Sequence, residues 1–256
     1  MHATEREALI VSALNDRGFV TYRELERIID ASPATIRRDL SRLASRGAIA
    51  RVHGGAKLSP AAPARQHLVG TPFIQSIAVN LEAKQAIGKA AAALCEPGEG
   101  VMMDGGTTTL QMCPHLEGLN LQVLTNSLHI VEALLPQEGT KVLVPSGVVF
   151  PEQNIILAPA GEDSMPRFHA PKLFMGAAAI GAQGVMQADI VLVAAERRLI
   201  NRAEQVILLV DSSKFHSSSG AIVCEIGEVD VIITDSGIPE EVREMLTSMG
   251  PRVIVA

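Results

Sequence analysis

The 256-residue chain contains no tryptophan, one tyrosine and only three cysteines. It also lacks any run approaching the about 18 consecutive apolar residues that a membrane-spanning helix requires. The first ten residues, MHATEREALI, carry charges where a secretory signal peptide needs an apolar core. The sequence therefore predicts no membrane association, and we expect the protein to be cytoplasmic.

The cysteines are too few and too scattered to form a disulfide framework. Cys95, Cys113 and Cys224 are odd in number, and no CxxC pair occurs. This pattern favours reduced, packed thiols. Cys113 and His115 flank a proline and would make at most half of a metal site, since a zinc site needs three or four ligands. We predict neither a metal nor a cofactor.

Charge is distributed unevenly along the chain. Residues 1–58 hold 10 Lys and Arg against 7 Asp and Glu, a net charge of +3, whereas residues 59–256 hold 12 against 21, a net charge of −9. A basic region joined to an acidic remainder is typical of nucleic-acid binding by the basic part. A solvated face of mixed charge would give the same balance, so the motifs must decide.

Three helices are predicted in the first 47 residues. The second starts at Thr21 with Glu24 three residues on, a capping box in which hydroxyl and carboxylate each accept a free backbone N–H. The third has Ser32 as its N-cap and Pro33 at its first helical position. Its apolar stripe faces the core and consists of Ile36, Leu40 and Leu43.

The third helix leaves basic and small polar residues on its other faces. A short helix, a tight connection and a basic helix of this kind favour a helix-turn-helix. The free N–H groups at the helix start can also bind a phosphate. The residues left outside the apolar stripe are Thr35, Arg37, Arg38, Ser41 and Arg42.

A glycine hairpin is predicted directly after these helices. Residues 48–53 alternate, and Gly54-Gly55 permits a tight turn. Each basic residue alone could be a solvated charge, but the combination of cap, proline, basic helix and hairpin indicates DNA binding. The basic residues near the tip of this wing are Arg51, His53 and Lys57.

The run SPATIRRDL…L…G…R.HGGA resembles the winged helix-turn-helix of the DeoR family of bacterial transcription regulators. The resemblance implies that residues 33–46 enter the major groove and that the wing touches the DNA backbone or minor groove. Phosphates would then be positioned by the helix start and base edges read by the paired arginines. The expected DNA-contacting residues are Ser32, Thr35, Arg37, Arg38, Arg42, Arg51, His53, Gly54 and Lys57.

The sequence divides into a winged helix-turn-helix over residues 1–58, a connector over residues 59–76 and an effector-sensing domain over residues 77–256. The connector is rich in Ala and Pro, which favours a partly extended linker. Beyond it, short apolar runs alternate with helical patterns. This pattern predicts an α/β domain with a mostly parallel sheet covered by helices.

Polar or glycine-rich residues follow several of these strands, where α/β folds bind ligands. Glycine lets backbone N–H groups approach a phosphate, and hydroxyls add donors. Each motif has a simpler reading: a turn for the Asp-Gly-Gly, a helix cap for the Thr-Asn-Ser, a structural pair for Asp211 and Lys214. Together they favour a site for a small anion.

This part of the chain resembles the DeoR effector-sensing domain, which is similar in fold to ribose-5-phosphate isomerase. The matching runs are EAKQAIGKAA, MDGGTTTLQM, LQVLTNSLHI, KLFMGAAAIGAQGV and LLVDSSKF. The resemblance implies a sugar phosphate or related metabolite as effector. The expected effector-binding residues are Lys84, Asp104, Gly105, Gly106, Thr107, Thr108, Thr125, Asn126, Ser127, Gly176, Asp211 and Lys214.

The chain departs from the family pattern at three places. Ser146-Gly147 stands where the family usually has Gly-Gly, and Ser76 where it often has Arg. The run GVMQADIVLVAAERRL lacks the usual hydroxyl pair after its glycine. These departures bear on the contacts to the effector and leave the DNA-binding region untouched.

Three functions fit the combined pattern. The favoured one is a transcriptional repressor of a carbohydrate-metabolism operon, working as a homo-oligomer on double-stranded operator DNA. The second is a sugar-phosphate isomerase-like enzyme with an accessory DNA-binding domain, for which Asp104 or Asp211 with Lys214 would supply acid–base chemistry. The third is an architectural DNA-binding protein. We assign no catalytic residue, because no candidate is needed beyond phosphate binding.

Overall fold

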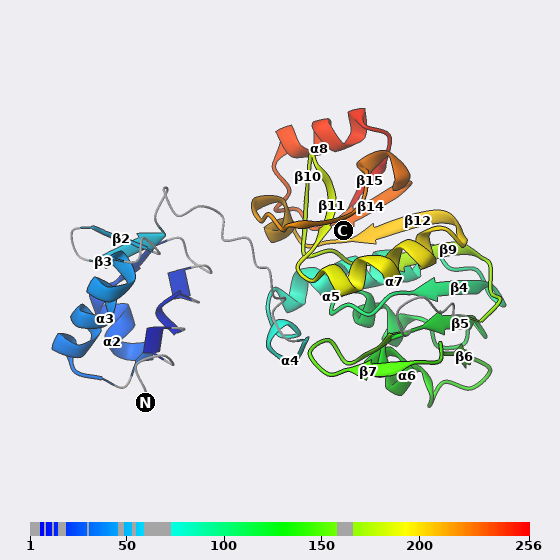
Figure 1. The fold of residues 1–256 in the computed structure, drawn as a ribbon, viewed down its shortest axis with the longest axis horizontal. Helices are drawn as coiled ribbons and strands as arrows, with labels where there is room; N and C mark the ends of the chain where they lie inside the picture. Colours follow the sequence, from blue (N-terminus) through cyan, green and yellow to red (C-terminus); the bar gives the residue numbers. More distant parts are fainter. Residues whose placement is uncertain are drawn as a thin grey trace. The chain divides into compact units, whose positions relative to one another are not determined.

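The computed structural model contains two compact units, Met1–Arg65 and Gln66–Ala256, which we call the head and the body and describe separately. Figure 1 shows their elements along the chain. The residues that the structure describes are 6–7, 9–11, 13–14, 19–29, 31–45, 49–52, 55–58, 73–157 and 166–256.

The head combines helices with a small antiparallel sheet whose strand order is β1-β3-β2. The described residues between 6 and 14 are helical, as predicted. Two further helices and three strands follow. Their bounds are β1 (Phe19–Thr21), α2 (Tyr22–Ile28), α3 (Pro33–Ser45), β2 (Ile49–Val52) and β3 (Gly55–Leu58).

The predicted start of α2 and the predicted apolar face of α3 are confirmed. The backbone N–H of Thr21 donates to the Glu24 carboxylate at 2.8 Å, and the N–H of Glu24 donates to the Thr21 hydroxyl at 3.3 Å. Ile36, Leu40 and Leu43 are buried in the core of the head. The capping box fixes the start of α2, and the apolar stripe fixes which face of α3 is left to solvent.

The predicted wing forms, but one of its glycines has a different role from the one expected. Strands β2 and β3 pair antiparallel, whereas His53 and Gly54 lie outside the described residues. Gly55 lies within β3 and pairs with Thr21 of β1, a strand that the sequence did not predict. A Cβ on Gly55 would lie 2.2 Å from the Val20 carbonyl oxygen. The position requires glycine because β1 packs so closely against it.

The body is built on a seven-stranded sheet in which every pairing is parallel, with the order β15-β14-β12-β9-β4-β5-β6. Strand β4 has β5 on one side and β9 on the other. The chain runs outward through β5 and β6 and returns on the opposite side of β4. The bounds are β4 (Gly100–Met103), β5 (Gln122–Thr125), β6 (Lys141–Leu143), β9 (Ala170–Met175), β12 (Ala203–Leu209), β14 (Val231–Thr234) and β15 (Arg252–Val255).

Helices cover both faces of this sheet. On one face Val101 and Met103 pack with Ile87 of α5, and on the other Met102 and Leu124 pack with Leu199 of α7. The first face also carries η1 and α6, and the second carries α8. The bounds are α5 (Leu81–Ala92), η1 (Thr109–His115), α6 (Leu128–Leu134), α7 (Ile190–Ile200) and α8 (Glu240–Ser248).

The body differs from the prediction in three local details. The apolar run at Ala221–Cys224 forms β13, which belongs to an antiparallel sheet with β10 (Ala179–Gly181) and β11 (Gly184–Gln187) instead of the large sheet. A hairpin of β7 (Val148–Phe150) and β8 (Ile155–Leu157) was not predicted. The segment η1, which the sequence predicted as helical, is a 3-10 helix and contains Pro114.

The predicted connector, residues 59–76, extends too far at its C-terminal end. Residues Phe73–Ser76 form α4, which the sequence assigned to the linker. The ring of Phe73 is 2% exposed and stacks on His129 of α6, with 4.4 Å between ring centroids. Its N–H donates to the carbonyl oxygen of Glu152 at 3.0 Å. These contacts make α4 part of the body.

The cysteines are free thiols, as predicted. Burial raises the pKa of Cys95, Cys113 and Cys224 to about 12, so the thiolates that react with oxidants or metals are scarce. Within the described parts of the chain, no helix is both long and apolar enough to cross a bilayer.

Candidate DNA-binding and effector-binding sites

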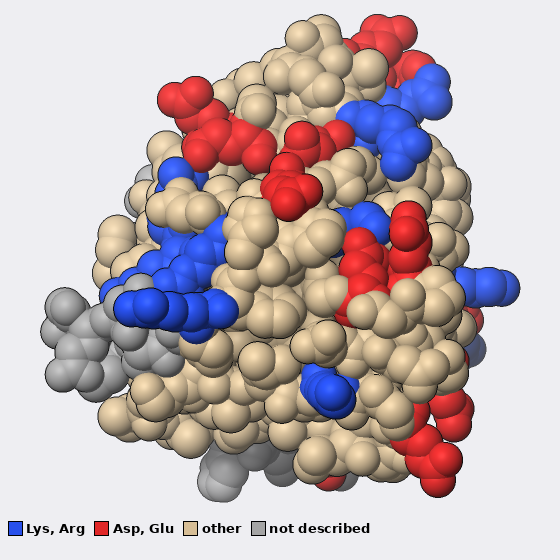
Figure 2. Space-filling view, turned by 90° about the vertical axis from the view of Figure 1, so that its right-hand side faces the viewer, with Lys and Arg blue, Asp and Glu red and all other residues tan. Residues whose placement is uncertain are grey.

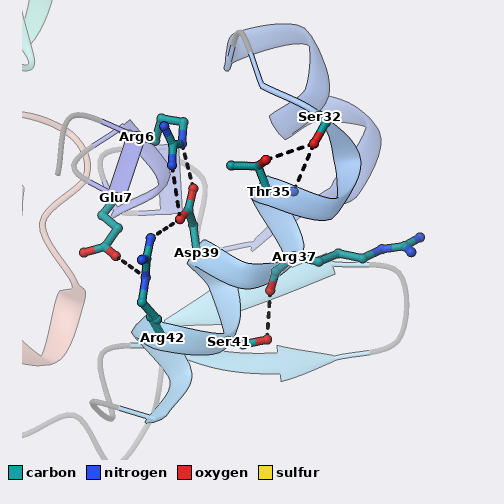
Figure 3. Close-up of polar contacts among 8 residues, drawn as sticks. All are labelled: Arg6, Glu7, Ser32, Thr35, Arg37, Asp39, Ser41 and Arg42. Atoms are coloured by element: carbon teal, nitrogen blue, oxygen red, sulfur yellow. Dashed lines mark hydrogen bonds and ion pairs between the residues drawn. The ribbon is translucent and has the colours of Figure 1, made fainter. Parts of the chain in front are cut away.

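Helix α3 presents exposed basic residues from a rigid frame. Arg37 and Arg38 are exposed. The two residues that follow them, Asp39 and Leu40, are buried. The Arg37 guanidinium lies 5.9 Å from the centroid of the Tyr22 ring, within range of a cation–π contact. Figure 3 shows the Arg37 side chain extending away from the polar network on the other side of α3. These two arginines remain the predicted readers of base edges.

That polar network is centred on the buried carboxylate of Asp39. Arg6 donates to Asp39 at 2.7 Å, and Arg42 donates to the same carboxylate (Figure 3). Arg42 also pairs with Glu7 at 3.0 Å. The guanidinium of Arg42 therefore ties α3 to the N-terminal helical segment. We expected Arg42 to contact DNA. The structure shows that its guanidinium is bonded to Asp39 and Glu7, so a contact with DNA stays a prediction.

Ser32 and Thr35 form a cap at the start of α3. Their hydroxyls lie 2.9 Å apart, and the N–H of Thr35 donates to the Ser32 hydroxyl at 3.3 Å. This arrangement satisfies one of the free N–H groups at the helix start. Contacts from these hydroxyls to DNA phosphates stay a prediction. Of the predicted wing residues, Arg51 and Lys57 lie on β2 and β3.

The predicted anion loop follows β4 and is held by bonds within itself. The N–H of Gly106 donates to the Thr109 hydroxyl at 3.0 Å, and that hydroxyl donates to the Asp104 carbonyl oxygen at 2.8 Å. The N–H of Gly105 donates to Asn126 Oδ1 at 3.1 Å. The two glycine N–H groups expected to cradle a phosphate are thus used in shaping the loop. Thr107 is half-buried and Thr108 buried in the same loop.

Asp104 is a buried carboxyl at the end of β4, where the order of strands reverses: β5 lies on one side of β4 and β9 on the other. Its N–H donates to the Phe174 carbonyl oxygen of β9 at 2.9 Å, which continues the pairing of β4. Burial raises the pKa of Asp104 to about 6, and the backbone of Gly105 and the side chain of Asn126 oppose this rise. Ligands of open α/β sheets bind at such switch points, beyond the carboxyl ends of the strands. The location therefore suits the predicted site.

The Thr-Asn-Ser run after β5 combines a cap with a buried amide. The Thr125 hydroxyl accepts the N–H of Ser127 at 3.1 Å, and the Ser127 hydroxyl caps α6 by accepting the N–H of Ile130 at 3.3 Å. The simpler reading of Ser127 as a helix cap is therefore correct. Asn126 instead points its oxygen at Gly105 and is 2% exposed.

Lys84, Asp211 and Lys214 form a second polar group. Lys84 is 3% exposed, and its Nζ donates to the Ser76 carbonyl oxygen at 2.7 Å. Burial lowers the pKa of Lys84 to about 8, and the charge of Lys214 adds to this while the charge of Asp211 opposes it. Asp211 accepts hydrogen bonds from Asn80 at 2.9 Å and from the Ser213 N–H at 3.1 Å.

A cleft of about 480 Å³ opens beside Asp211, the member of the predicted set that lines it. The cleft lies between the start of α5 and the loops after β12 and β14. Burial would raise the pKa of Asp235 in this cleft, but hydrogen bonds from Ser212 and Gly237 outweigh burial and lower it. The residues lining the cleft are Asn80, Leu81, Glu82, Ala83, Asp211, Ser212, Ser213, His216 and Asp235.

The structure divides the predicted effector residues between two sides of the sheet edge. Side chains alternate along a strand, so Asp104 follows Met102 on the side of α7, and Asp211 follows Leu209 on the side of α5. Gly176 ends β9, the strand between β4 and β12. A Cβ there would meet no atom nearer than the Leu209 oxygen at 3.9 Å.

Sequence reasoning missed three residues of this region. Thr109 holds the loop, and Asn80 contacts Asp211. Glu196 of α7 is 3% exposed, and the charge of Asp104 is among the causes that raise its pKa well above the ordinary value, after burial itself. The sequence signal for Glu196 was a glutamate within an otherwise apolar stretch of a predicted helix. Thr109 offered none beyond belonging to a run of three threonines.

Figure 2 shows acidic and basic side chains interspersed over the face it presents. Groups of three or more His, Cys, Asp or Glu that could hold a metal ion are absent among the described residues.

Two protein-family descriptions match the chain. The DeoR-like helix-turn-helix domain matches residues 6–60, and the DeoR C terminal sensor domain matches residues 79–236. The second match alone covers more than half of the 256 residues. The chain belongs to the DeoR family.

Curated DeoR-like relatives match along nearly the whole length. The HTH-type transcriptional regulator UlaR of Shigella sonnei (strain Ss046) is 29% identical over 255 residues, covering 99% of both chains. The putative aga operon transcriptional repressor of Escherichia coli O157:H7 is 30% identical over 259 residues, covering 98% of this chain and 93% of the relative.

The solved structures that match part of the chain include an enzyme. Ribose 5-phosphate isomerase A from Methanocaldococcus jannaschii has 14% identity and a TM-score of 0.38, and covers 53% of this chain and 55% of its own. The predicted fold, a small winged helix-turn-helix plus a larger parallel α/β domain, is confirmed. As a DeoR-family member, this protein is a DNA-binding transcriptional regulator and not an isomerase.

Proposed function

We propose that this DeoR-family regulator represses a carbohydrate-metabolism operon and that a phosphorylated sugar, or a related small anionic metabolite, controls its affinity for the operator. It acts as a homo-oligomer in the bacterial cytoplasm, because a helix-turn-helix commonly reads two half-sites from a dimer. The relative from Escherichia coli that is named an aga operon repressor supports the choice of operon class.

The observation that carries the proposal is the buried Lys84 beside Lys214. Asp211 and Lys214 are the charges that act on Lys84, so this set of three residues holds two cations and one carboxylate. A buried ammonium is unfavourable unless an opposite charge compensates it. A phosphate supplies that charge. The hydroxyl-rich loop after β4 lies at the same edge of the sheet, with β9 between β4 and β12.

Control of DNA binding requires that the ligand bind two states of the protein with different affinity. The head provides the DNA-facing arginines on α3, and the body provides the buried polar groups that a ligand would satisfy. A chain with both parts has what a ligand-responsive repressor needs. We propose Asp104, Thr107, Thr108, Asn126, Gly176, Asp211, Lys84 and Lys214 as the residues around the ligand.

A binding screen of the full chain tests this function. Pentose 5-phosphates, hexose 6-phosphates and inorganic phosphate are added singly, and the thermal midpoint is followed, since a ligand of the folded state raises it. The best ligand is then tested for its effect on operator affinity. Lys84→Ala should lose both responses, whereas Lys89→Ala, an exposed lysine on the same helix, should keep them. Retention of both responses in Lys84→Ala would remove Lys84 from the site.

The affinity for the phosphate-bearing ligand should fall as pH rises above about 8. The pKa of Lys84 is about 8 in the free protein, so its ammonium is present below that pH and is lost above it. The ligand phosphate is already close to doubly charged above pH 7, so the change reports on the protein. Titration calorimetry from pH 7 to 9.5 measures it. In Lys84→Arg the decline should disappear, because the guanidinium keeps its charge. The same decline in both proteins would refute the assignment.

A further inference from the structure

Glu196 is a buried carboxyl that the phosphate contacts leave unused. It lies on α7 and is 3% exposed. Its Oε1 accepts a hydrogen bond from Gln187 Nε2 at 2.6 Å. Its Oε2 has no hydrogen-bond partner among the described residues. An unpaired oxygen in the interior costs free energy, so a ligand that satisfies it gains affinity.

A second unpaired atom belongs to Asn126. Its Oδ1 is occupied by the N–H of Gly105, and its Nδ2 has no hydrogen-bond acceptor within the part of the chain that is described. The amide favours the charged form of Asp104 and so lies near that carboxyl, without a hydrogen bond of good geometry. Asn126 therefore offers a free donor where Glu196 offers a free oxygen.

Both atoms lie on the same side of the sheet edge. Asp104 and Asn126 follow Met102 and Leu124, whose side chains pack on the side of α7, the helix that carries Glu196. The charge of Asp104 acts on Glu196, which makes the two carboxyls neighbours. Cationic partners of Asp104 and Glu196 are absent among the described ion pairs. The cluster is negative in character, unlike the Lys84–Lys214 group.

We propose that Asp104, Asn126 and Glu196 form a subsite for the hydroxyl groups of the effector. This inference rests on the proposed function and adds an orientation: the hydroxyl end meets these three residues, and the phosphate lies toward Lys84 and Lys214. A hydroxyl both donates and accepts, so it can satisfy a free amide donor and a carboxyl oxygen together. A phosphate only accepts and is repelled by Asp104, and an ammonium only donates and leaves Asn126 Nδ2 unpaired.

The two oxygens of Glu196 predict how its variants behave. Oε1 accepts from Gln187, and Oε2 is left for the ligand. Burial first, and then the charge of Asp104, raise the pKa of Glu196 well above its ordinary value. Glu196→Gln keeps the shape of the side chain, an oxygen for Gln187 and one further polar atom for the ligand. Glu196→Ala removes both.

The test measures dissociation constants of the full chain for two kinds of probe: the pentose or hexose phosphate that most raises the thermal midpoint, and inorganic phosphate. Glu196→Ala should raise the dissociation constant of the sugar phosphate by about tenfold or more and leave that of inorganic phosphate unchanged. Glu196→Gln should stay within about threefold of the parent for both probes. The exposed Glu117→Ala is the matched control. Circular dichroism and ligand-free operator affinity confirm folding.

A wild-type measurement keeps the test valid if Glu196→Ala does not fold. Deoxy analogues of the same sugar phosphate should bind about tenfold more weakly when the missing hydroxyl is the one that meets the subsite. Equal binding of all deoxy analogues, or equal weakening of sugar phosphate and inorganic phosphate in Glu196→Ala, would overturn the subsite while the proposed function stands. If only unphosphorylated sugars and polyols bind, and Glu196→Ala weakens them, the subsite stands and the phosphate effector is wrong. If the wild type binds none of these probes, both proposals fail.

Discussion

In the head, the buried carboxylate of Asp39 is bonded by two arginines, whereas in the body the buried carboxyls of Asp104 and Glu196 lack a basic partner among the described residues. A buried polar network whose groups are all paired makes the structure around it rigid. A buried polar group without a partner costs free energy, and a ligand that pairs with it gains affinity. We propose that this difference separates a frame that holds α3 in place from a group of buried carboxyls that a ligand completes.

The largest effect should come from breaking the frame of the head. Asp39→Ala leaves Arg6 and Arg42 without their shared carboxylate and should destabilise the head by about 2–4 kcal/mol, below the full cost of a buried pair because Arg42 is partly exposed. Operator binding should be abolished. Calorimetry and hydrogen exchange of the head amides measure the change. Asp39→Asn should cost less, since it keeps an acceptor. An unchanged head in Asp39→Ala would mean that the network contributes nothing.

The reading surface of α3 should be separable from that frame. Arg37→Ala or Arg38→Ala should weaken specific operator binding by about 1–3 kcal/mol for each base edge that is no longer read, with stability unchanged. Fluorescence anisotropy on the operator and on scrambled DNA makes the measurement. An equal weakening on both DNAs would assign the residue to phosphate binding. Unchanged sequence preference in both variants would contradict the assigned helix.

The body should become more stable when its buried charge is removed. The folded pKa of Asp104, about 6, lies above its ordinary value of 3.8, so stability is fully present below pH 4 and is lost as pH rises through 6. Asp104→Asn should therefore raise the free energy of unfolding by about 1–3 kcal/mol at pH 8 and change it little at pH 4.

Asp235 provides the opposite control for Asp104. Its pKa is lowered because hydrogen bonds from Ser212 and Gly237 outweigh burial, so its contribution is present at neutral pH and is lost as the pH falls. Asp235→Asn should lower stability at pH 7. Urea titrations at several pH values give both numbers. Equal pH dependence in the two variants would show that the two carboxyls do not differ in this way.

The smallest effect concerns a local cap. Thr21→Ala removes the capping box of α2 and should lower the free energy of unfolding of the head by about 1 kcal/mol. Urea unfolding measures it. Thr21→Ser, which keeps the hydroxyl, should stay close to the parent. A cost several times larger would mean that Thr21 supports β1 or the core rather than the helix start.

Much of the fold follows from patterns in the sequence because those patterns are local. The box at Thr21 and Glu24, the stripe of Ile36 and Leu40, and alternating apolar runs with helical segments require only residues close along the chain. The role of Gly55 was missed because it depends on β1, whose three residues are too short to show a period. The antiparallel pairing of β13 with β11 was also missed, because the two strands lie far apart in the sequence.

The positions of the proposed effector residues follow only in part from the sequence. Asp104, Asn126 and Asp211 could be named from the sequence because each follows a strand of the sheet. Alternation then places Asp211 on the opposite side from Asp104, which the order of strand ends along the chain does not reveal. Glu196 comes from a helix, so a search of strand ends could not find it.

We propose that a ligand held in the body changes DNA binding by the head. The operator affinity of the full chain should be measured with and without the sugar phosphate that most raises its thermal midpoint, in the wild type and in Lys84→Ala. We expect a ligand-dependent shift in the wild type and none in Lys84→Ala, with the ligand-free affinities equal. A sugar phosphate that binds tightly and leaves operator affinity unchanged in the wild type would contradict it.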